Sequence, residues 1–113
     1  MINIKFFRKN SIVLGFEISG HSGYAKSGQD IVCAAVSAVS QSTCLGIIEI
    51  LKINAKLKRD DNAGYLYLRL PKDVEQTKMQ NAQTLLVTMK QSLENIAFQF
   101  NDYIKMEVKD EIN

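Results

Sequence analysis

Residues 31–48 form the longest uncharged run in the chain, and this run constrains the fold more than any other feature. It predicts a helix from about residue 31 to residue 51, with no charge before Glu49. A helix that is uncharged all round is buried on more than one side. We therefore expect one side to pack on a sheet and the other to meet a second helix or another subunit.

A membrane-spanning role for this helix is not favoured by its composition. The run contains five polar residues: Ser37, Ser40, Gln41, Ser42 and Thr43. A spanning helix needs about 20 mostly apolar residues. The first residues, MINIKFFRKN, also lack the long apolar core of a signal peptide. We therefore expect a soluble protein without a membrane partner.

Two alternating runs before this helix predict a β-hairpin. Apolar and polar residues alternate over residues 2–7 and again over residues 12–19, which is the period of a strand. A short polar segment, residues 8–11, separates the two runs and is a plausible turn. Two such runs with a short gap are typical of antiparallel strands.

The second half of the chain predicts two further strands, a helix and a last strand. A basic strand at residues 53–59 and a strand at residues 65–70 flank the turn-forming segment DDNAG. Apolar residues at three- and four-residue spacing then mark a helix from about 74 to 100. Residues 104–109 alternate as a half-exposed strand. The order ββαββαβ predicts an α+β fold: a two-layer sandwich with two helices on a mostly antiparallel sheet.

The composition predicts a single domain spanning residues 1–113, because 113 residues with 46% apolar content suffice for one core. The net charge of +2 is too small to indicate nucleic-acid binding by itself. Lys52, Lys56, Lys58 and Arg59 form either a solvated strand face or a docking patch for an anionic partner. The two alternatives are not separated by the sequence.

The two cysteines, Cys33 and Cys44, cannot form a disulfide within one helix. Eleven residues of helix separate them by about 16 Å along the axis, and a disulfide needs Cα atoms within about 7 Å. Free thiols fit a reducing compartment, so we expect a cytoplasmic protein. One histidine and two cysteines at these positions also do not make a metal site. No cofactor is predicted.

Cys33 lies at the predicted start of the helix, a position that can make its thiol reactive. Asp30 is placed to cap that helix, and Ser27 is a second candidate for the cap. Free backbone N–H groups and the helix dipole favour an anion at this end. Because the thiolate is the reactive form of cysteine, Cys33 is better placed as a nucleophile than Cys44. The same N–H groups could hold an oxyanion.

His21 is the only histidine in the chain, and it follows the end of a predicted strand. The loop of eleven residues before Cys33 is long enough to bring the imidazole over the helix start, where it could take the thiol proton. Gly20, Gly23 and Gly28 would let this loop bend. Ser37 lies one turn beyond Cys33 on the same face and could bond near the thiol.

These residues alone leave two interpretations open. In the first, Cys33 and His21 are a nucleophile and its base. In the second, Cys33 is a small buried hydrophobe, His21 is a turn residue, Asp30 is a plain helix cap and Ser37 is a packing residue. One cysteine and one histidine in a loop–helix unit are a weak motif.

Two sequence blocks resemble the signature of the ribosomal-processing cysteine protease family, the Prp-type proteases of bacteria. The family pattern is G-H-[AS]-G-x-A, followed by a glycine and then D-I-[VI]-C-A-A-V-S. Here residues 20–25 read GHSGYA and residues 30–37 read DIVCAAVS, joined by KSGQ. The signature positions show no departure, and length and element order are similar over the whole chain.

This resemblance implies a cysteine endopeptidase with a Cys–His dyad. By motif position, Cys33 is implied as the nucleophile and His21 as the base, with Asp30 and Ser37 supporting them and Gly20 as a hinge. The implied substrate is the precursor of the twenty-seventh protein of the large ribosomal subunit, which loses a short N-terminal extension during ribosome assembly. The resemblance also implies a homodimer and a mobile loop over the site.

Two other classes of function are compatible with the residues. A non-catalytic ribosome-associated binding module would fit the mild basic charge. A thiol redox sensor based on Cys33 is less favoured, because no resolving cysteine lies nearby.

Overall fold

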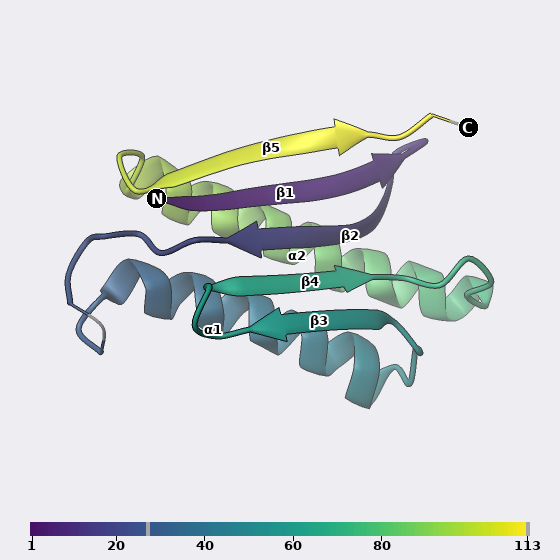
Figure 1. Cartoon of the computed structure of the whole chain (residues 1–113). Coiled ribbons are helices and arrows are strands. Elements are labelled where there is room, and N and C mark those ends of the chain that lie inside the picture. Colours follow the sequence, from purple (N-terminus) through teal and green to yellow (C-terminus); the bar gives the residue numbers. More distant parts are fainter. Residues whose placement is uncertain (27, 113) are drawn as a thin grey trace.

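The computed structural model describes residues 1–26 and 28–112. They form a five-stranded sheet and two helices in the predicted order ββαββαβ (Figure 1). The strands are β1 (Ile2–Lys9), β2 (Ile12–Ser19), β3 (Lys56–Asp60), β4 (Tyr65–Arg69) and β5 (Ile104–Asp110). The helices are α1 (Ile31–Leu45), which continues into the π-helical turn η1 (Gly46–Ile50), and α2 (Gln76–Gln99).

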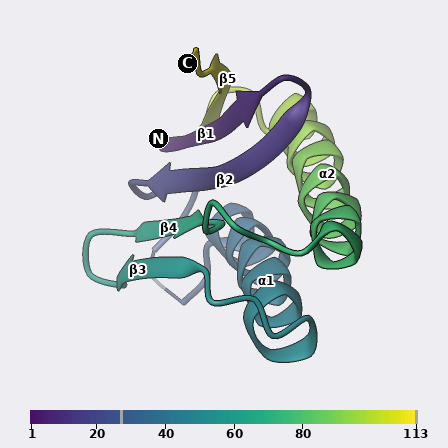
Figure 2. The ribbon, with the colours of Figure 1, turned by 90° about the vertical axis from the view of Figure 1, so that its right-hand side faces the viewer.

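The sheet has the strand order β3-β4-β2-β1-β5 and is mostly antiparallel, as predicted. Among the strand pairings of the described residues, only that of β1 with β5 is parallel. Strands β1 and β2 form the expected hairpin, with Asn10 and Ser11 in its turn at positive φ, the backbone that two-residue hairpin turns require. Both helices cover the same face of the sheet, so the molecule has two layers (Figure 2). The predicted α+β fold class is confirmed.

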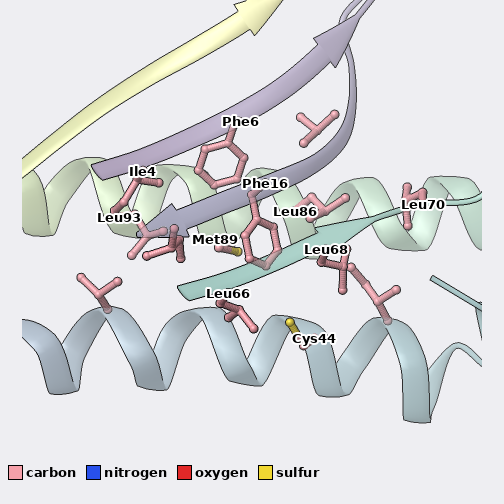
Figure 3. Close-up of a cluster of buried hydrophobic side chains, with 14 of the residues drawn as sticks. Ile4, Phe6, Phe16, Cys44, Leu66, Leu68, Leu70, Leu86, Met89 and Leu93 are labelled. Atoms are coloured by element: carbon pink, nitrogen blue, oxygen red, sulfur yellow. The ribbon is translucent and has the colours of Figure 1, made fainter. Parts of the chain in front are cut away.

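The core lies between the sheet and the two helices (Figure 3). Phe6 and Phe16 project from β1 and β2 with ring centroids 6.0 Å apart, and both are fully buried. The core-facing side of α2 contributes Ala82, Leu86, Met89 and Leu93. The apolar stripe of the predicted second helix therefore packs in the core.

Helix α1 buries only part of its uncharged surface. The side facing the sheet and α2 contributes Val32, Val36, Ser40, Thr43 and Cys44. The opposite side is exposed and carries Ala34, Ala38 and Leu45. Residues 31–50 have a mean hydropathy of 1.8 and enough length to cross a membrane by composition alone; here 33% of that stretch is buried within the fold. Helix α1 thus packs on the sheet and meets a second helix, α2, as one of the two expected alternatives, and its remaining side is exposed in the described chain.

The strand predicted at residues 53–59 begins later, at Lys56. The reason is that η1 is followed by Lys52 at a positive φ of 57°, after which Ile53 is buried against the core. The chain enters β3 only after this connection. All five residues of β3 are exposed, and it forms one edge of the sheet. The second predicted helix begins at Gln76, because the Glu75 side chain accepts bonds from the N–H groups of Thr77 and Lys78 and caps it there.

Two connections meet at one end of the molecule. The segment after β2 leads from Gly20 to the start of α1, and the β3–β4 turn lies at the same end (Figure 1). A Cβ atom on Gly64, in that turn, would collide with the carbonyl oxygen of Gly20. This close contact brings the turn beside the segment that carries the candidate residues.

Candidate active site

Asp30 caps helix α1, as predicted. Its backbone is extended, and its Oδ1 atom accepts hydrogen bonds of 3.0 Å from the N–H groups of both Val32 and Cys33. These are two of the N–H groups that a helix start leaves without an intrahelical partner. The other cap candidate, Ser27, lies outside the described residues. The cap sets the position of Cys33 in the first turn.

Cys33 is half-buried, and its sulfur contacts Ser22. The Ser22 N–H points at Sγ over 3.4 Å, and the thiol can donate to the Ser22 hydroxyl over 3.6 Å. That hydroxyl in turn donates to Oδ2 of Asp30. Ser22 therefore joins the thiol to the capping carboxylate. It was not among the sequence candidates, although its place directly after the only histidine was a usable signal.

The Asp30 carboxylate is held in its ionised form. Burial opposes ionisation, but hydrogen bonds from the Ser22 hydroxyl and the Cys33 backbone outweigh it and hold the pKa at about 2. The normal value is 3.8. At neutral pH a negative charge thus lies at the start of α1, where the helix dipole favours it.

His21 is exposed and is bonded to the β3–β4 turn. Its Nε2 atom lies 3.1 Å from the carbonyl oxygen of Asn62. No hydrogen bond joins His21 to Cys33 among the described residues, yet both line one hollow of about 280 Å³. The structure therefore brings the predicted dyad residues to the same hollow and gives each of them another partner.

Ser37 and Gly20 line the same hollow. Ser37 is exposed, and the side-chain bonds found for Cys33 in the described part of the chain come from Ser22 rather than from Ser37. Gly20 has a φ of 92°, and a Cβ atom there would collide with the carbonyl oxygen of Met1. A glycine is therefore needed at position 20 for backbone reasons, whatever its role in loop motion.

The hollow runs between α1 and the β3–β4 hairpin. Arg59 and Asp61 line its hairpin side and form an ion pair of 2.6 Å. Beyond Gln41 and Arg59 it continues into a second, more apolar groove. Besides Gln41, Arg59 and Glu49, that groove is lined by Cys44, Leu45, Ile48, Leu57 and Leu66. The hollow and the groove together form an elongated surface beside the Cys33 thiol.

The expected oxyanion role of the first helical N–H groups does not fit this arrangement. Those of Val32 and Cys33 already donate to the Asp30 carboxylate. The N–H of Ala34 donates to the Asp30 carbonyl at 3.0 Å. The cap that positions Cys33 thus occupies the N–H groups of Val32 and Cys33, so an oxyanion would need other donors than these two.

Cys44 is a structural residue, buried in the core and pointing from α1 into the apolar cluster (Figure 3). Burial raises the pKa of its thiol to about 11. Both cysteines are free, as predicted. Within residues 1–26 and 28–112, no group of three or more His, Cys, Asp or Glu side chains is arranged to hold a metal ion.

Comparison with known proteins relates the fold and the site to one family. The family model described as cysteine protease Prp matches residues 1–105. The ribosomal processing cysteine protease Prp of Bacillus subtilis is 33% identical over 94 residues, which cover 83% of this chain and 84% of that protein.

Solved structures give the same relationship. The crystal structure of an essential ribosomal processing protease Prp from S. aureus, in complex with a covalently linked product peptide, has a TM-score of 0.86 and 29% identity. It covers 96% of this chain and 100% of that one. A second structure of the S. aureus protease, with a substrate peptide, has a TM-score of 0.81 and 28% identity, with the same coverage of both chains.

Proposed function

The chain belongs to the cysteine protease Prp family, and from this premise we propose which substrate it cleaves and which residues act. The substrate is the precursor of a large-subunit ribosomal protein, the twenty-seventh, which carries a short N-terminal extension. The chain removes that extension during ribosome assembly. It uses Cys33 as the nucleophile and His21 as the base.

One observation carries the assignment of these two residues. Cys33 lies half-buried in the first turn of α1, and His21, at the other end of the loop that precedes this helix, lines the same hollow. The other cysteine, Cys44, is buried, and burial raises the pKa of its thiol to about 11. A nucleophile and a base that share one accessible hollow are what covalent peptide cleavage needs.

The proposed reaction has two steps. His21 takes the proton of the Cys33 thiol, and the sulfur attacks the scissile carbonyl carbon. The C–N bond breaks, the leaving amine receives the proton from the imidazolium, and a thioester remains. Water then attacks the thioester, which releases the carboxylic acid and restores the thiol.

Peptide binding is proposed to bring the two residues together. In the free chain the hydrogen-bond partner found for the Cys33 sulfur among the described residues is Ser22, and this contact is the one that must change. Glycines at positive φ, at residues 20, 23 and 28, lie in the connecting loop and allow it to rearrange. The structures of the S. aureus protease with peptides support a peptide-binding role for this surface by similarity.

Asp30 and Ser37 are proposed to support the reaction in different ways. Asp30 fixes the start of α1 and holds Ser22 against the thiol. Ser37 lies exposed in the hollow one turn beyond Cys33, where its hydroxyl can reach the bound peptide. Its hydroxyl could also supply an oxyanion donor, since the N–H groups of Val32 and Cys33 already donate to Asp30.

A cleavage assay tests this proposal. The extended ribosomal protein is incubated with the wild type and with Cys33→Ala, His21→Ala and Cys44→Ala, and product masses are read. We expect loss of one N-terminal peptide with the wild type and with Cys44→Ala, and no product with the first two variants. Equal cleavage by wild type and Cys33→Ala would reject the assignment of the nucleophile. Co-sedimentation with ribosomes without any cleavage would favour the binding-module alternative.

The chain is also proposed to act as a cytoplasmic homodimer. The exposed uncharged side of α1 supports this, because Leu45 is 56% exposed and Ala34 and Ala38 lie on the same side. Sedimentation equilibrium of the wild type and of Ala38→Glu would measure the assembly. A monomeric wild type at micromolar concentration would contradict the dimer. Fractionation of cells would test the cytoplasmic location, which predicts that the protein is recovered in the cytoplasmic fraction.

A further inference from the structure

We propose that the β3–β4 turn fixes His21 in the tautomer that carries its proton on Nε2. The Nδ1 atom is then the one that exchanges a proton with Cys33. The choice of Nδ1 as the base rests on the proposed function, whereas the tautomer itself does not. The element responsible is the backbone of Asn62, which acts as a positioning residue.

The first argument is the direction of one hydrogen bond. Nε2 of His21 lies 3.1 Å from the Asn62 carbonyl oxygen. A carbonyl oxygen can only accept, so the ring nitrogen must donate. A neutral imidazole has a single N–H, and its other nitrogen carries the lone pair. The bond to Asn62 therefore leaves Nδ1 as the basic atom.

The second argument is that the turn is built to hold this carbonyl in place. Oδ1 of Asp60 accepts bonds from the N–H groups of Asn62, at 3.1 Å, and Ala63, at 3.3 Å. The N–H of Gly64 donates to the Asp61 carbonyl at 3.2 Å. Bonds of this kind from an aspartate side chain to the backbone two residues on stabilise a tight turn. The Asn62 carbonyl thus has a defined direction.

The third argument is direct contact between the turn and the histidine segment. A Cβ atom on Gly64 would lie 3.0 Å from Cε1 of His21 and would collide with the Gly20 carbonyl. Gly64 also has a φ of 62°, a backbone that favours glycine. Because the turn packs against both residues, we expect His21 to keep its bond to Asn62 when peptide binds.

The chemical consequence is that a backbone carbonyl, that of Asn62, orients the imidazole of His21, where a side chain could have done so. When Nδ1 takes the thiol proton, the Asn62 carbonyl remains an acceptor for the Nε2–H of the imidazolium and stabilises its charge. A third group of this kind orients the base in other nucleophile–base pairs. Since the group is a backbone carbonyl, the identity of the side chain at position 62 is unimportant, and Asp60 becomes the side chain that matters.

Nitrogen NMR of the single histidine tests the tautomer without any cleavage. In ¹⁵N-labelled protein, at a pH high enough for the imidazole to be neutral, we expect Nε2 to give a pyrrole-type signal and Nδ1 a pyridine-type signal. The urea-unfolded chain supplies the reference mixture of tautomers. A folded-state mixture equal to that reference, or a pyrrole-type Nδ1, would overturn the proposal.

Variants of Asp60 connect the tautomer to the reaction. Asp60→Ala removes the acceptor that holds the turn, so its tautomer ratio should move toward the unfolded reference and kcat should fall by about tenfold with little change in KM. Asp60→Asn keeps an Oδ1 acceptor and should restore both values. Asp73→Ala, an exposed aspartate before α2, is the matched control and should change neither. An unchanged tautomer and kcat in Asp60→Ala would reject the role of the turn.

The two proposals fail in distinguishable ways. The expected tautomer in a protein that does not cleave the ribosomal precursor would reject the proposed function and leave the tautomer assignment standing. A mixed tautomer in an active protease would reject the present inference alone.

Discussion

Asp30 and Cys33 are joined by a hydrogen bond of 3.0 Å from the backbone N–H of the cysteine to Oδ1 of the aspartate. The residue that caps α1 thereby fixes the residue that we propose as nucleophile. The second carboxylate oxygen of Asp30 receives the Ser22 hydroxyl, which also contacts the thiol. One carboxylate thus determines both the start of the helix and the surroundings of the sulfur.

Replacing Asp30 by asparagine should make the acid stability of the protein less pH-dependent. Asparagine can still cap the helix, so the change removes mainly the charge. The folded-state pKa of about 2 lies below the normal 3.8, so the ionised form stabilises the fold above about pH 4. This contribution, about 1 to 2 kcal/mol after allowance for solvent screening, should disappear as the pH falls from 4 to 2.

Urea unfolding of the wild type and Asp30→Asn between pH 2 and pH 6 measures this effect. The difference in unfolding free energy should be largest at pH 6 and should approach zero near pH 2. Asp73→Asn is the control, because Asp73 is exposed and lies outside the site. A difference that stays constant over the whole range would show that the Asp30 charge does not stabilise the fold.

Ser22→Ala should destabilise the protein and raise the pKa of Asp30. The Ser22 side chain is buried, donates to Asp30 and accepts the N–H of Tyr24 at 3.1 Å. Removing it leaves polar groups without partners, at a cost of about 1 to 3 kcal/mol. A carbon NMR titration of the Asp30 carboxylate would read the pKa. Ser37→Ala, in the same hollow but exposed, should leave both quantities unchanged, and equal effects of the two variants would contradict the role of Ser22.

Most of the fold could be predicted from the sequence because periodicity reports burial directly. The alternation at residues 2–7 and 12–19 and the spacing from Met79 to Phe100 each mark one buried face, and the structure has these elements. The errors lie where tertiary contacts decide. The start of β3 depends on Lys52 and on the burial of Ile53, and neither is visible as a pattern in INAKLKR.

The site was predictable in part for a comparable reason. A cysteine after a capping aspartate has a local signal, and the cap at Asp30 is as expected. The hydrogen-bond partners of His21 and Cys33 have no local sequence signal, because they depend on how the chain is placed in three dimensions. Asn62 is 41 residues from His21 and contacts it through a backbone carbonyl, which no side-chain pattern reveals. The occupied N–H groups at the helix start also follow only from the observed cap.

Alkylation should separate the two cysteines. Cys33 is half-buried beside the hollow, whereas Cys44 is buried and its pKa is raised to about 11. At pH 8 about a thousandth of the Cys44 thiols would be ionised, and the thiolate is the reactive form. Iodoacetamide followed by peptide mass analysis should therefore label Cys33 well before Cys44 in the folded chain. Unfolding in urea should abolish the difference, and equal labelling of both in the folded state would contradict it.

Gly20→Ala and Gly23→Ala should separate backbone strain from steric contact at the histidine. Both glycines have positive φ, 92° and 73°, which cost other residues about 1 to 2 kcal/mol. A Cβ on Gly23 meets nothing within 4 Å, but one on Gly20 collides with the Met1 carbonyl. Gly20→Ala should therefore be the less stable variant in urea, and it should also lose most of its cleavage activity because His21 follows directly. Equal unfolding free energies for the two variants would mean that the contact with Met1 does not constrain the histidine segment.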